Sequence, residues 1–288
     1  MGWRQKSKGK NRSIKDEVFK RLSTMFRNGK GVSRHENDDN SIHSDSTYRT
    51  YKKQCYRFAD YARETGCKTL DEARDVVDEY LIMCMERGDS PASVKTYAAA
   101  LAKLYGCSIT DFVKIPSRKR ENIKRSRYEV AYDKHISEKT EKALAKFTEC
   151  IGCRSSSLKK MTGNDLVDDG KGRYGVRLHE KGGKDRIAII YHPDPAIMEE
   201  VISAFKKAGS AHVIPHVHAA YDNHFYRGVY AKNLYEHIAR PIEMIPPSER
   251  YHYRGDMKGV ILDKRAMRYV SKMMGHNRID VIASNYLY

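Results

Sequence analysis

Residues 173–191 read Arg-Tyr-Gly-Val-Arg-Leu-His-Glu-Lys-Gly-Gly-Lys-Asp-Arg-Ile-Ala-Ile-Ile-Tyr. Two short apolar-rich stretches stand on either side of a glycine turn formed by Lys181-Gly-Gly-Lys184. Stretches of this kind around such a turn predict a β-hairpin. Outside this hairpin the apolar residues mostly follow the spacing of amphipathic helices. The sequence therefore predicts a mainly helical protein that contains one small sheet.

The composition is strongly basic. The chain of 288 residues carries 54 Lys and Arg against 37 Asp and Glu, a net charge of +17. A basic surface favours a polyanionic partner such as nucleic acid, and a solubilising excess of charge is the alternative. No apolar run approaches the length of a membrane span, and the Lys- and Arg-rich start lacks the apolar segment of a secretory signal. With six scattered cysteines read as reduced thiols, we expect a cytoplasmic, nucleoid-associated protein.

The length predicts two domains preceded by an arm. The arm, residues 1–43, is basic and contains one helix, which begins after a Ser13 cap and ends at Gly29. Residues 44–113 contain three helical patterns, and the third begins with the cap-and-proline pair Ser90-Pro91. These patterns predict a small all-helical domain.

A basic linker, residues 114–136, follows the helical domain. Pro116 and the absence of an apolar period exclude a regular helix over its first part. Its candidate DNA-binding residues are Lys114, Arg118, Lys119, Arg120, Lys124, Arg125 and Arg127. Such a segment is suited to lie along a phosphate backbone, and a solvated tether is the alternative.

The larger second domain, residues 137–288, begins with a helix capped by Ser137. After the hairpin, helical patterns return at 194–208, about 219–240 and 260–274. The domain is therefore expected to combine helices with a small β-sheet.

Five positions in this domain carry the chemistry. Arg154 follows Cys150-Ile-Gly-Cys, and Lys181 stands at the hairpin turn. The others are Arg254 in Tyr-His-Tyr-Arg-Gly, His276 in Met-Met-Gly-His, and Tyr286 in Ser-Asn-Tyr. Each residue alone is a weak signal. The order Arg, hairpin Lys, Arg, Gly-His, Tyr is more specific, and in it the sequence resembles the tyrosine recombinases, the family of phage and transposon integrases and chromosome-dimer resolvases.

The resemblance covers the basic linker and all of 137–288. It implies that residues 44–113 are a SAM-like core-binding domain, and that the two domains form a C-shaped clamp around double-stranded DNA. It also implies a homo-tetramer in the synaptic complex, accessory DNA-bending proteins as possible partners, and a role in the integration or transposition of a mobile element.

The chemistry of the five residues is consistent with this resemblance. Cleavage of a phosphodiester by a side chain places negative charge on the non-bridging oxygens, and two guanidiniums, Arg154 and Arg254, are suited to stabilise it. Tyr286 is the expected nucleophile. By resemblance, Lys181 protonates the leaving 5′-oxygen and His276 positions the phosphate. Lys184 is a candidate DNA contact. No metal or other cofactor is expected.

The sequence departs from the family pattern near these residues. The position three before the second arginine, often His in the family, is Tyr251, while His252 lies one residue out of register. The spacing from His276 to Tyr286 is one residue longer than usual, so Tyr288 is the alternative nucleophile.

Two further motifs contain possible metal ligands but do not form a recognisable metal-binding pattern. The pair Cys150-x-x-Cys153 lacks a second pair at metal spacing and is expected to pack in the core. The cluster of His212, His216 and His218 lacks a completing carboxylate or thiolate, which favours a surface loop over a metal site.

Two other functions remain open at this stage. A type IB topoisomerase shares the chemistry but relaxes DNA without a defined crossover site; the separate helical domain favours a recombinase. A catalytically degenerate, architectural DNA-binding protein is favoured by Tyr251 and disfavoured by the intact set of five residues. The sequence as a whole predicts a site-specific DNA recombinase that forms a 3′-phosphotyrosyl intermediate.

Overall fold

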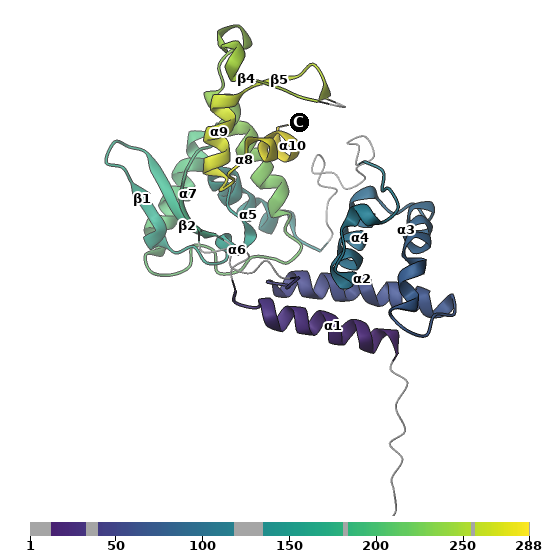
Figure 1. Cartoon of the computed structure of the whole chain (residues 1–288). Helices are drawn as coiled ribbons and strands as arrows, with labels where there is room; N and C mark the ends of the chain where they lie inside the picture. The colour runs from purple at the N-terminus through teal and green to yellow at the C-terminus, as the bar shows by residue number, and fades with distance from the viewer. Residues whose placement is uncertain (1–12, 33–39, 118–134, 181–183, 255–256, 288) are drawn as a thin grey trace, which may run out of the picture. The chain divides into compact units, whose positions relative to one another are not determined.

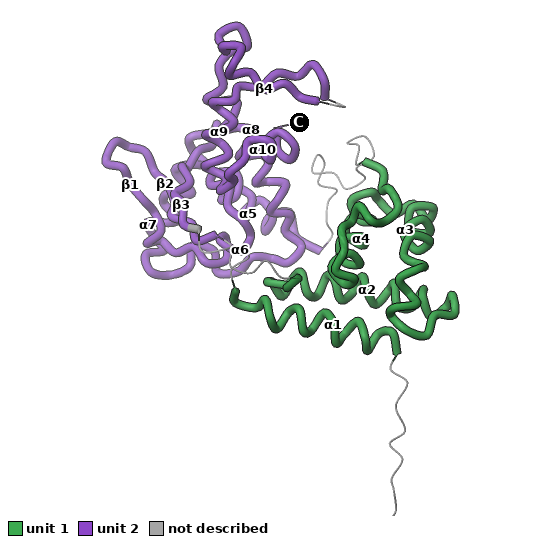
Figure 2. The backbone as a smooth tube through the Cα atoms, in the orientation of Figure 1, with its two compact units in different colours: residues 1–122 green, residues 123–288 purple. Residues whose placement is uncertain are grey.

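A computed structural model describes residues 13–32, 40–117, 135–180, 184–254 and 257–287. The chain divides into two compact units, residues 1–122 and 123–288 (Figure 2). Among the described residues, no helix is long and apolar enough to cross a membrane.

In the described residues of unit 1 all regular elements are helices (Figure 1). Its elements are α1 (Ile14–Gly29), α2 (Asp45–Glu64), the 3₁₀ turn η1 (Glu72–Val76), α3 (Val77–Glu86), α4 (Pro91–Tyr105) and η2 (Ile109–Asp111). The predicted helix starts are confirmed: Ser13 forms a capping box with Asp16, and Ser90 caps α4 with Pro91 at its first position. The α4 helix ends at Gly106, whose φ of 69° suits glycine.

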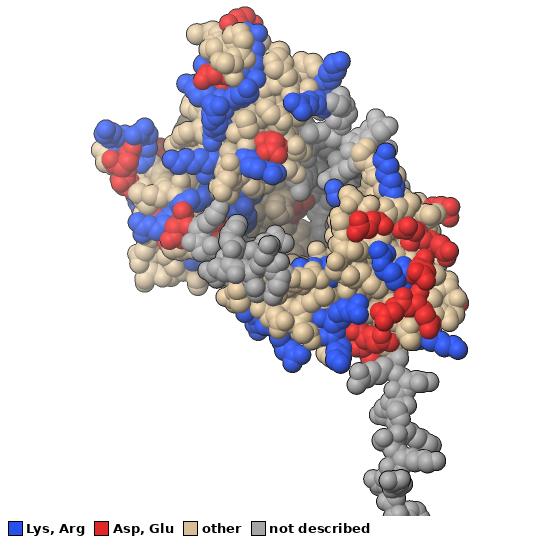
Figure 3. Space-filling view, in the orientation of Figure 1, with Lys and Arg blue, Asp and Glu red and all other residues tan. Residues whose placement is uncertain are grey.

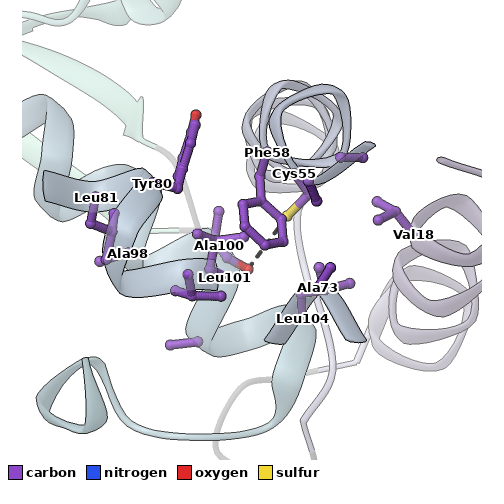
Figure 4. Close-up of a cluster of buried hydrophobic side chains, with 14 of the residues drawn as sticks. Val18, Cys55, Phe58, Ala73, Tyr80, Leu81, Ala98, Ala100, Leu101 and Leu104 are labelled. Carbon is purple, nitrogen blue, oxygen red and sulfur yellow. Dashed lines mark hydrogen bonds between the residues drawn. The ribbon is translucent and has the colours of Figure 1, made fainter. Parts of the chain in front are cut away.

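The first helix belongs to the core of unit 1. Val18 and Leu22 of α1 are fully buried, in one cluster with Cys55 and Phe58 of α2 and Leu101 of α4 (Figure 4). Each buried aliphatic side chain of this size stabilises the fold by about 1.5–3 kcal/mol. The helix that the sequence placed in a basic arm is thus a structural part of the helical unit.

Unit 2 combines helices with two small sheets, and so confirms the predicted fold class. Its elements are α5 (Glu138–Ile151), α6 (Ser155–Leu158), η4 (Gly163–Asp165), β1 (Leu166–Asp168), β2 (Tyr174–Glu180), β3 (Lys184–Ile189), α7 (Pro195–Ala208), α8 (Asn223–Ile238), η5 (Ile242–Met244), η6 (Pro247–Glu249), β4 (Arg250–His252), β5 (Ile261–Asp263), α9 (Lys264–Met273) and α10 (Ile279–Tyr286).

The predicted hairpin is confirmed as β2 and β3, which pair antiparallel with Glu180 opposite Lys184. A third strand, β1, extends this sheet on the other side of β2. Val176, Leu178 and Glu180 alternate along β2 and are all buried, so the strand turns this face toward the interior. The last position of that buried face is a carboxylate rather than an apolar side chain.

Helix α8 lies in the interior of unit 2, where Tyr230 and Ala231 are fully buried. The α5 helix ends directly against it, at Gly152, which adopts a φ of 62°. A Cβ atom at Gly152 would lie 2.2 Å from the Tyr230 ring, so only glycine permits this approach. The tight turn places the next segment, Cys153 and Arg154, beside α8.

The chain between α8 and α9 differs from the prediction. It forms the strand pair β4–β5, with Tyr251 opposite Leu262, where the sequence predicted helix up to about 240 and again from 260. Arg240 anchors the base of this strand pair through ion pairs with the buried Asp263 (2.8 Å) and with Glu249 (2.5 Å). Strands of three residues are too short to produce a detectable period in the sequence.

Candidate active site

Arg154 stands at the start of α6, immediately after the Gly152 turn. The Asn223 side-chain amide of α8 donates a hydrogen bond of 2.9 Å to the carbonyl oxygen of Cys153, which fixes the backbone just before Arg154. The Arg154 guanidinium forms an ion pair with Glu180 at the end of β2. About a third of its side chain (30%) remains exposed, so one side of the guanidinium is accessible to a ligand.

Arg186 lies on β3 beside Arg154 and is largely buried. Its Nη2 lies 2.9 Å from Oε1 of Glu180, and its guanidinium also donates to the carbonyl oxygens of Met273 and Gly152. Burial, followed by the neighbouring Arg227, lowers the pKa of Arg186 to about 10. Arg186 therefore stays charged at neutral pH and joins the hairpin to the end of α9.

Arg227 is the most deeply buried charged residue of the site, with no exposed surface. It projects from α8 and donates hydrogen bonds to the carbonyl oxygens of Gly152 (2.6 Å) and Met274. Its Nη2 lies 3.4 Å from Nε2 of His276. The next residue on α8 is Gly228, where a Cβ atom would lie 3.8 Å from the Tyr286 ring. Helix α8 thus places Arg227 next to His276 and Gly228 next to the Tyr286 ring.

His276 and Tyr286 complete the cluster. The loop that carries His276 is fixed by Ser271, whose backbone carbonyl accepts from the His276 N–H (2.8 Å) and whose hydroxyl donates to its carbonyl oxygen. The rings of His276 and Tyr286 are 5.8 Å apart between centroids. Burial, followed by Arg227, Arg154 and Arg186, lowers the pKa of His276 to about 4. The imidazole is consequently neutral at physiological pH.

The cluster carries an excess of positive charge next to a phenol. Three guanidiniums face one carboxylate, Glu180, while His276 is neutral. Burial lowers the pKa of Arg154, and Arg227 and Arg186 lower it further, whereas Tyr286 raises it. Among the described residues, three buried side-chain atoms have no hydrogen-bond partner: Asn223 Oδ1, Arg227 Nε and Glu180 Oε2, the last of which is the atom in the ion pair with Arg154. Arg154 is the partly exposed guanidinium of this cluster, so it is suited to bind an anion such as a phosphate.

The structure brings together three of the five residues that the sequence selected: Arg154, His276 and Tyr286. Lys181 lies outside the described residues, between the end of β2 and the start of β3. The alternative nucleophile Tyr288 also lies outside them.

Two of the predicted DNA contacts lie in the described part of the chain. Lys114 is exposed in unit 1, and Lys184 begins β3. The remaining linker residues lie outside the described part of the chain: Arg118, Lys119, Arg120, Lys124, Arg125 and Arg127.

Arg254 is not brought to the cluster. It is exposed and follows β4, and no described contact links it to Arg154, His276 or Tyr286. Its neighbour Tyr251 pairs within the β4–β5 strand pair and packs against the ring of Tyr253, while His252 is exposed. The arginine that lies beside His276 is Arg227.

A signal for Arg227 is present in the sequence. His224 stands three residues before it, which is the spacing that the family often shows before its second arginine. His224 is exposed in the first turn of α8, and its backbone N–H donates to Asp222. The order of motifs in the sequence favours Arg254 instead. The sequence does not reveal the β4–β5 strand pair, which lies between Arg227 and His276.

The two weaker motifs are a buried cysteine pair and a histidine cluster. Cys150 and Cys153 are fully buried in the core of unit 2. The rings of His216 and His218 contact each other edge to face. Within the part of the chain that the structure describes, no group of three or more His, Cys, Asp or Glu side chains could hold a metal ion.

Comparison with known proteins identifies the fold. No family model matches the sequence, and no curated protein matches it. Among solved structures, the XerH site-specific recombinase bound to palindromic difH substrate in a post-cleavage complex matches with a TM-score of 0.52 and 13% identity, over 98% of this chain and 96% of that one. The pre-cleavage complex of XerH with difH matches with a TM-score of 0.52 and 15% identity, over 96% and 94%. The chain therefore has the fold of the tyrosine recombinases, and the resemblance seen in the sequence is confirmed at the level of the fold.

Proposed function

We propose that this protein is a site-specific DNA recombinase that cuts and rejoins strands through a 3′-phosphotyrosyl intermediate. The observation that carries the proposal is the cluster of Arg154, Arg227, His276 and Tyr286, in which Arg227 approaches His276 and the His276 ring lies beside the Tyr286 ring. The shared fold supports it, since XerH is a site-specific recombinase bound to its difH substrate. Fold alone does not determine function, so the proposal depends on the site.

In the proposed mechanism Arg154 binds the non-bridging oxygens of the scissile phosphate, and Arg227 stabilises their growing charge from its buried position next to His276. Guanidiniums present two parallel N–H donors and remain charged, which suits an oxyanion whose charge grows in the transition state. Arg227 provides this charge from a buried position, where solvent screens it little. We therefore assign the role of the second arginine to Arg227 rather than to Arg254.

The nucleophile and the proton donor complete the reaction. The Tyr286 oxygen forms a bond to phosphorus as the bond to the 5′-oxygen breaks, and Lys181 protonates the departing oxygen. Attack by a 5′-hydroxyl of another strand reverses these steps, so the phosphodiester energy is retained and no co-reactant is consumed. His276, neutral because of its lowered pKa, hydrogen-bonds the phosphate rather than adding a further charge.

The charge distribution supports a DNA partner. Figure 3 shows Lys and Arg side chains spread over the visible face of unit 2, whereas Asp and Glu gather on unit 1 around α3. We propose that the basic linker and Lys114 bind the phosphate backbone and that four copies assemble on paired sites. The electrostatic part of this binding is expected to weaken steeply as salt is added.

The proposal is tested with labelled, nicked duplexes from the ends of the genetic element that encodes the protein. The nick lets the cleaved fragment diffuse away, so a covalent adduct accumulates and survives a denaturing gel. We expect an adduct with the wild type and with Tyr288→Phe, and none with Tyr286→Phe. Loss in Tyr288→Phe alone would move the nucleophile to Tyr288. Tight binding with no adduct in the wild type would favour an architectural protein.

A second assay separates the recombinase from a topoisomerase. The wild-type protein is incubated with a supercoiled plasmid that lacks the element ends, and with one that carries them. We expect strand exchange only with the second plasmid. Efficient relaxation of the first would contradict the proposal.

A further inference from the structure

Glu180 occupies an unusual place for a carboxylate. It is the last residue of β2, its side chain is 3% exposed, and it lies between the guanidiniums of Arg154 and Arg186. Burying a charge in this way is unfavourable unless opposite charges and hydrogen bonds compensate for the lost water. The two arginines provide that compensation, so the three side chains form one charged unit.

Arg186 gives this unit a fixed base. Its side chain is 10% exposed and is attached by hydrogen bonds to Met273 at the end of α9 and to Gly152 at the end of α5. Gly275 lies against it: a Cβ atom there would be 2.9 Å from Arg186 Nε and 3.7 Å from Arg154 Nη1. Glu180 is therefore held in place by Arg186, and Arg154 in turn is held by Glu180.

The three arginines of the site have different attachments. Arg227 is fixed by the carbonyl oxygens of Gly152 and Met274, and Arg186 by those of Gly152 and Met273. The structure describes no hydrogen bond from the Arg154 side chain to any backbone carbonyl. The contact of Arg154 with Glu180 is its only described ion pair. Without Glu180, repulsion from Arg186 and Arg227 would act on the one arginine of the three that is free to move.

We propose that Glu180 is a positioning residue, which holds the Arg154 guanidinium in the orientation that receives the scissile phosphate. This inference rests on the proposed function. Glu180 does not contact the phosphate itself, because its negative charge would repel the non-bridging oxygens. It acts through Arg154. In the sequence Glu180 immediately precedes Lys181, so the residue that positions Arg154 is next to the proposed proton donor along the chain.

A double-mutant cycle tests this role, with the rate of covalent adduct formation on nicked duplex as the readout. Glu180→Gln keeps the size of the side chain and removes its charge, and we expect the rate to fall about 10- to 100-fold while the affinity for DNA stays within about threefold. In an Arg154→Ala background, the same change should cost less than about threefold, because residues that act through one another are not additive. The matched control is Glu141→Gln, a buried carboxylate that accepts a hydrogen bond from Tyr226 outside the site; it should leave the rate unchanged.

A second variant guards against misfolding. Glu180→Gln leaves the buried Arg186 without its counter-charge, which can destabilise unit 2. Glu180→Gln combined with Arg186→Met removes both charges, so the thermal midpoint should recover while adduct formation stays slow. Full recovery of the rate in this double variant would overturn the positioning role.

The outcomes separate the two proposals. Suppose that the wild type forms the adduct and that Glu180→Gln slows adduct formation by the same factor in the wild-type and the Arg154→Ala backgrounds. That result would overturn the positioning role alone. A loss in Glu141→Gln as large as that in Glu180→Gln would do the same, since burial rather than Arg154 would then explain the effect. Absence of an adduct with the wild type would overturn the proposed function together with this inference.

Discussion

At the scale of single residues, Arg227 departs most from what the sequence predicts. Hydrophobic patterns treat Arg as a surface residue, because charged side chains are seldom fully buried unless they are paired. Arg227 breaks this rule: it is fully buried on α8 and directed toward Gly152, Met274 and His276. The sequence shows that His224 stands three residues before Arg227. Only the fold shows that Arg227, and not Arg254, lies next to His276.

Substitution of the two arginines tests this assignment. Arg227→Ala is expected to slow adduct formation by about 10²–10³-fold, the loss typical of one donor to a developing oxyanion. Arg254→Ala, an exposed change, should stay within about threefold. Because Arg227 is buried, Arg227→Lys is measured alongside it: this variant keeps the charge but loses the fork that reaches two carbonyls. A larger loss from Arg254→Ala than from either Arg227 variant would refute the assignment.

His276 carries a testable pKa. Burial and three neighbouring guanidiniums lower the pKa of His276 to about 4, against an ordinary value of about 6.5. The folded protein thus resists protonation that the unfolded chain accepts. The stability that the neutral His276 ring contributes to the folded state is complete above pH ~6.5. It is lost as the pH falls toward the pKa of His276 in the folded state.

The measurement is an NMR titration of the histidine ring nitrogens, with His276→Gln to assign the signal. Arg186→Met should raise the pKa of His276, because one of the three positive charges is removed. A His276 midpoint near 6.5 in the wild type would show that the imidazole is not in the described environment.

At the scale of elements, periodicity explains which parts were predictable. The helices of unit 1 span several turns each, and the residues that cap them are close in sequence. The strands of the β2–β3 hairpin show several alternations of buried and exposed residues. The β4–β5 strand pair has three residues in each strand and depends on the ion pairs of Arg240, which connect residues distant in sequence. Likewise α1 was predicted as a helix, but its place in the core of unit 1 depends on tertiary contacts that its own sequence does not reveal.

The Gly152 turn offers a prediction at this scale. Gly152→Ala imposes a left-handed backbone on a residue with a Cβ atom, and that atom would overlap the Tyr230 ring at 2.2 Å. The strained backbone alone costs about 1–2 kcal/mol, and the overlap adds to it. Gly170→Ala is the control, because Gly170 has a φ of 69° but no atom within 4 Å of the added Cβ.

Urea unfolding followed by circular dichroism measures both glycine variants. Gly152→Ala should lower the unfolding midpoint of unit 2 clearly more than Gly170→Ala. Equal effects would show that α5 and α8 do not approach each other as described.

At the scale of the whole molecule, the charge of +17 is expected to act mainly through the basic linker. Each phosphate neutralised by Lys or Arg contributes about 0.9 to the slope of log affinity against log salt. Replacing Lys119, Arg120, Lys124 and Arg125 by Gln should therefore reduce the slope by up to about four. Fluorescence anisotropy with labelled duplex between low and moderate salt measures it. An unchanged slope would mean that the linker is a tether without phosphate contacts.

The central claim is that Tyr286, beside Arg154, Arg227 and His276, attacks the DNA backbone. Peptide mass spectrometry of the trapped adduct, after nuclease digestion of the DNA, tests it most directly. We predict a nucleotide linked through phosphate to the peptide that contains Ser-Asn-Tyr-Leu-Tyr, with fragment ions that place the modification on Tyr286. A nucleotide on any other residue, or an intact adduct in Tyr286→Phe, would contradict the account.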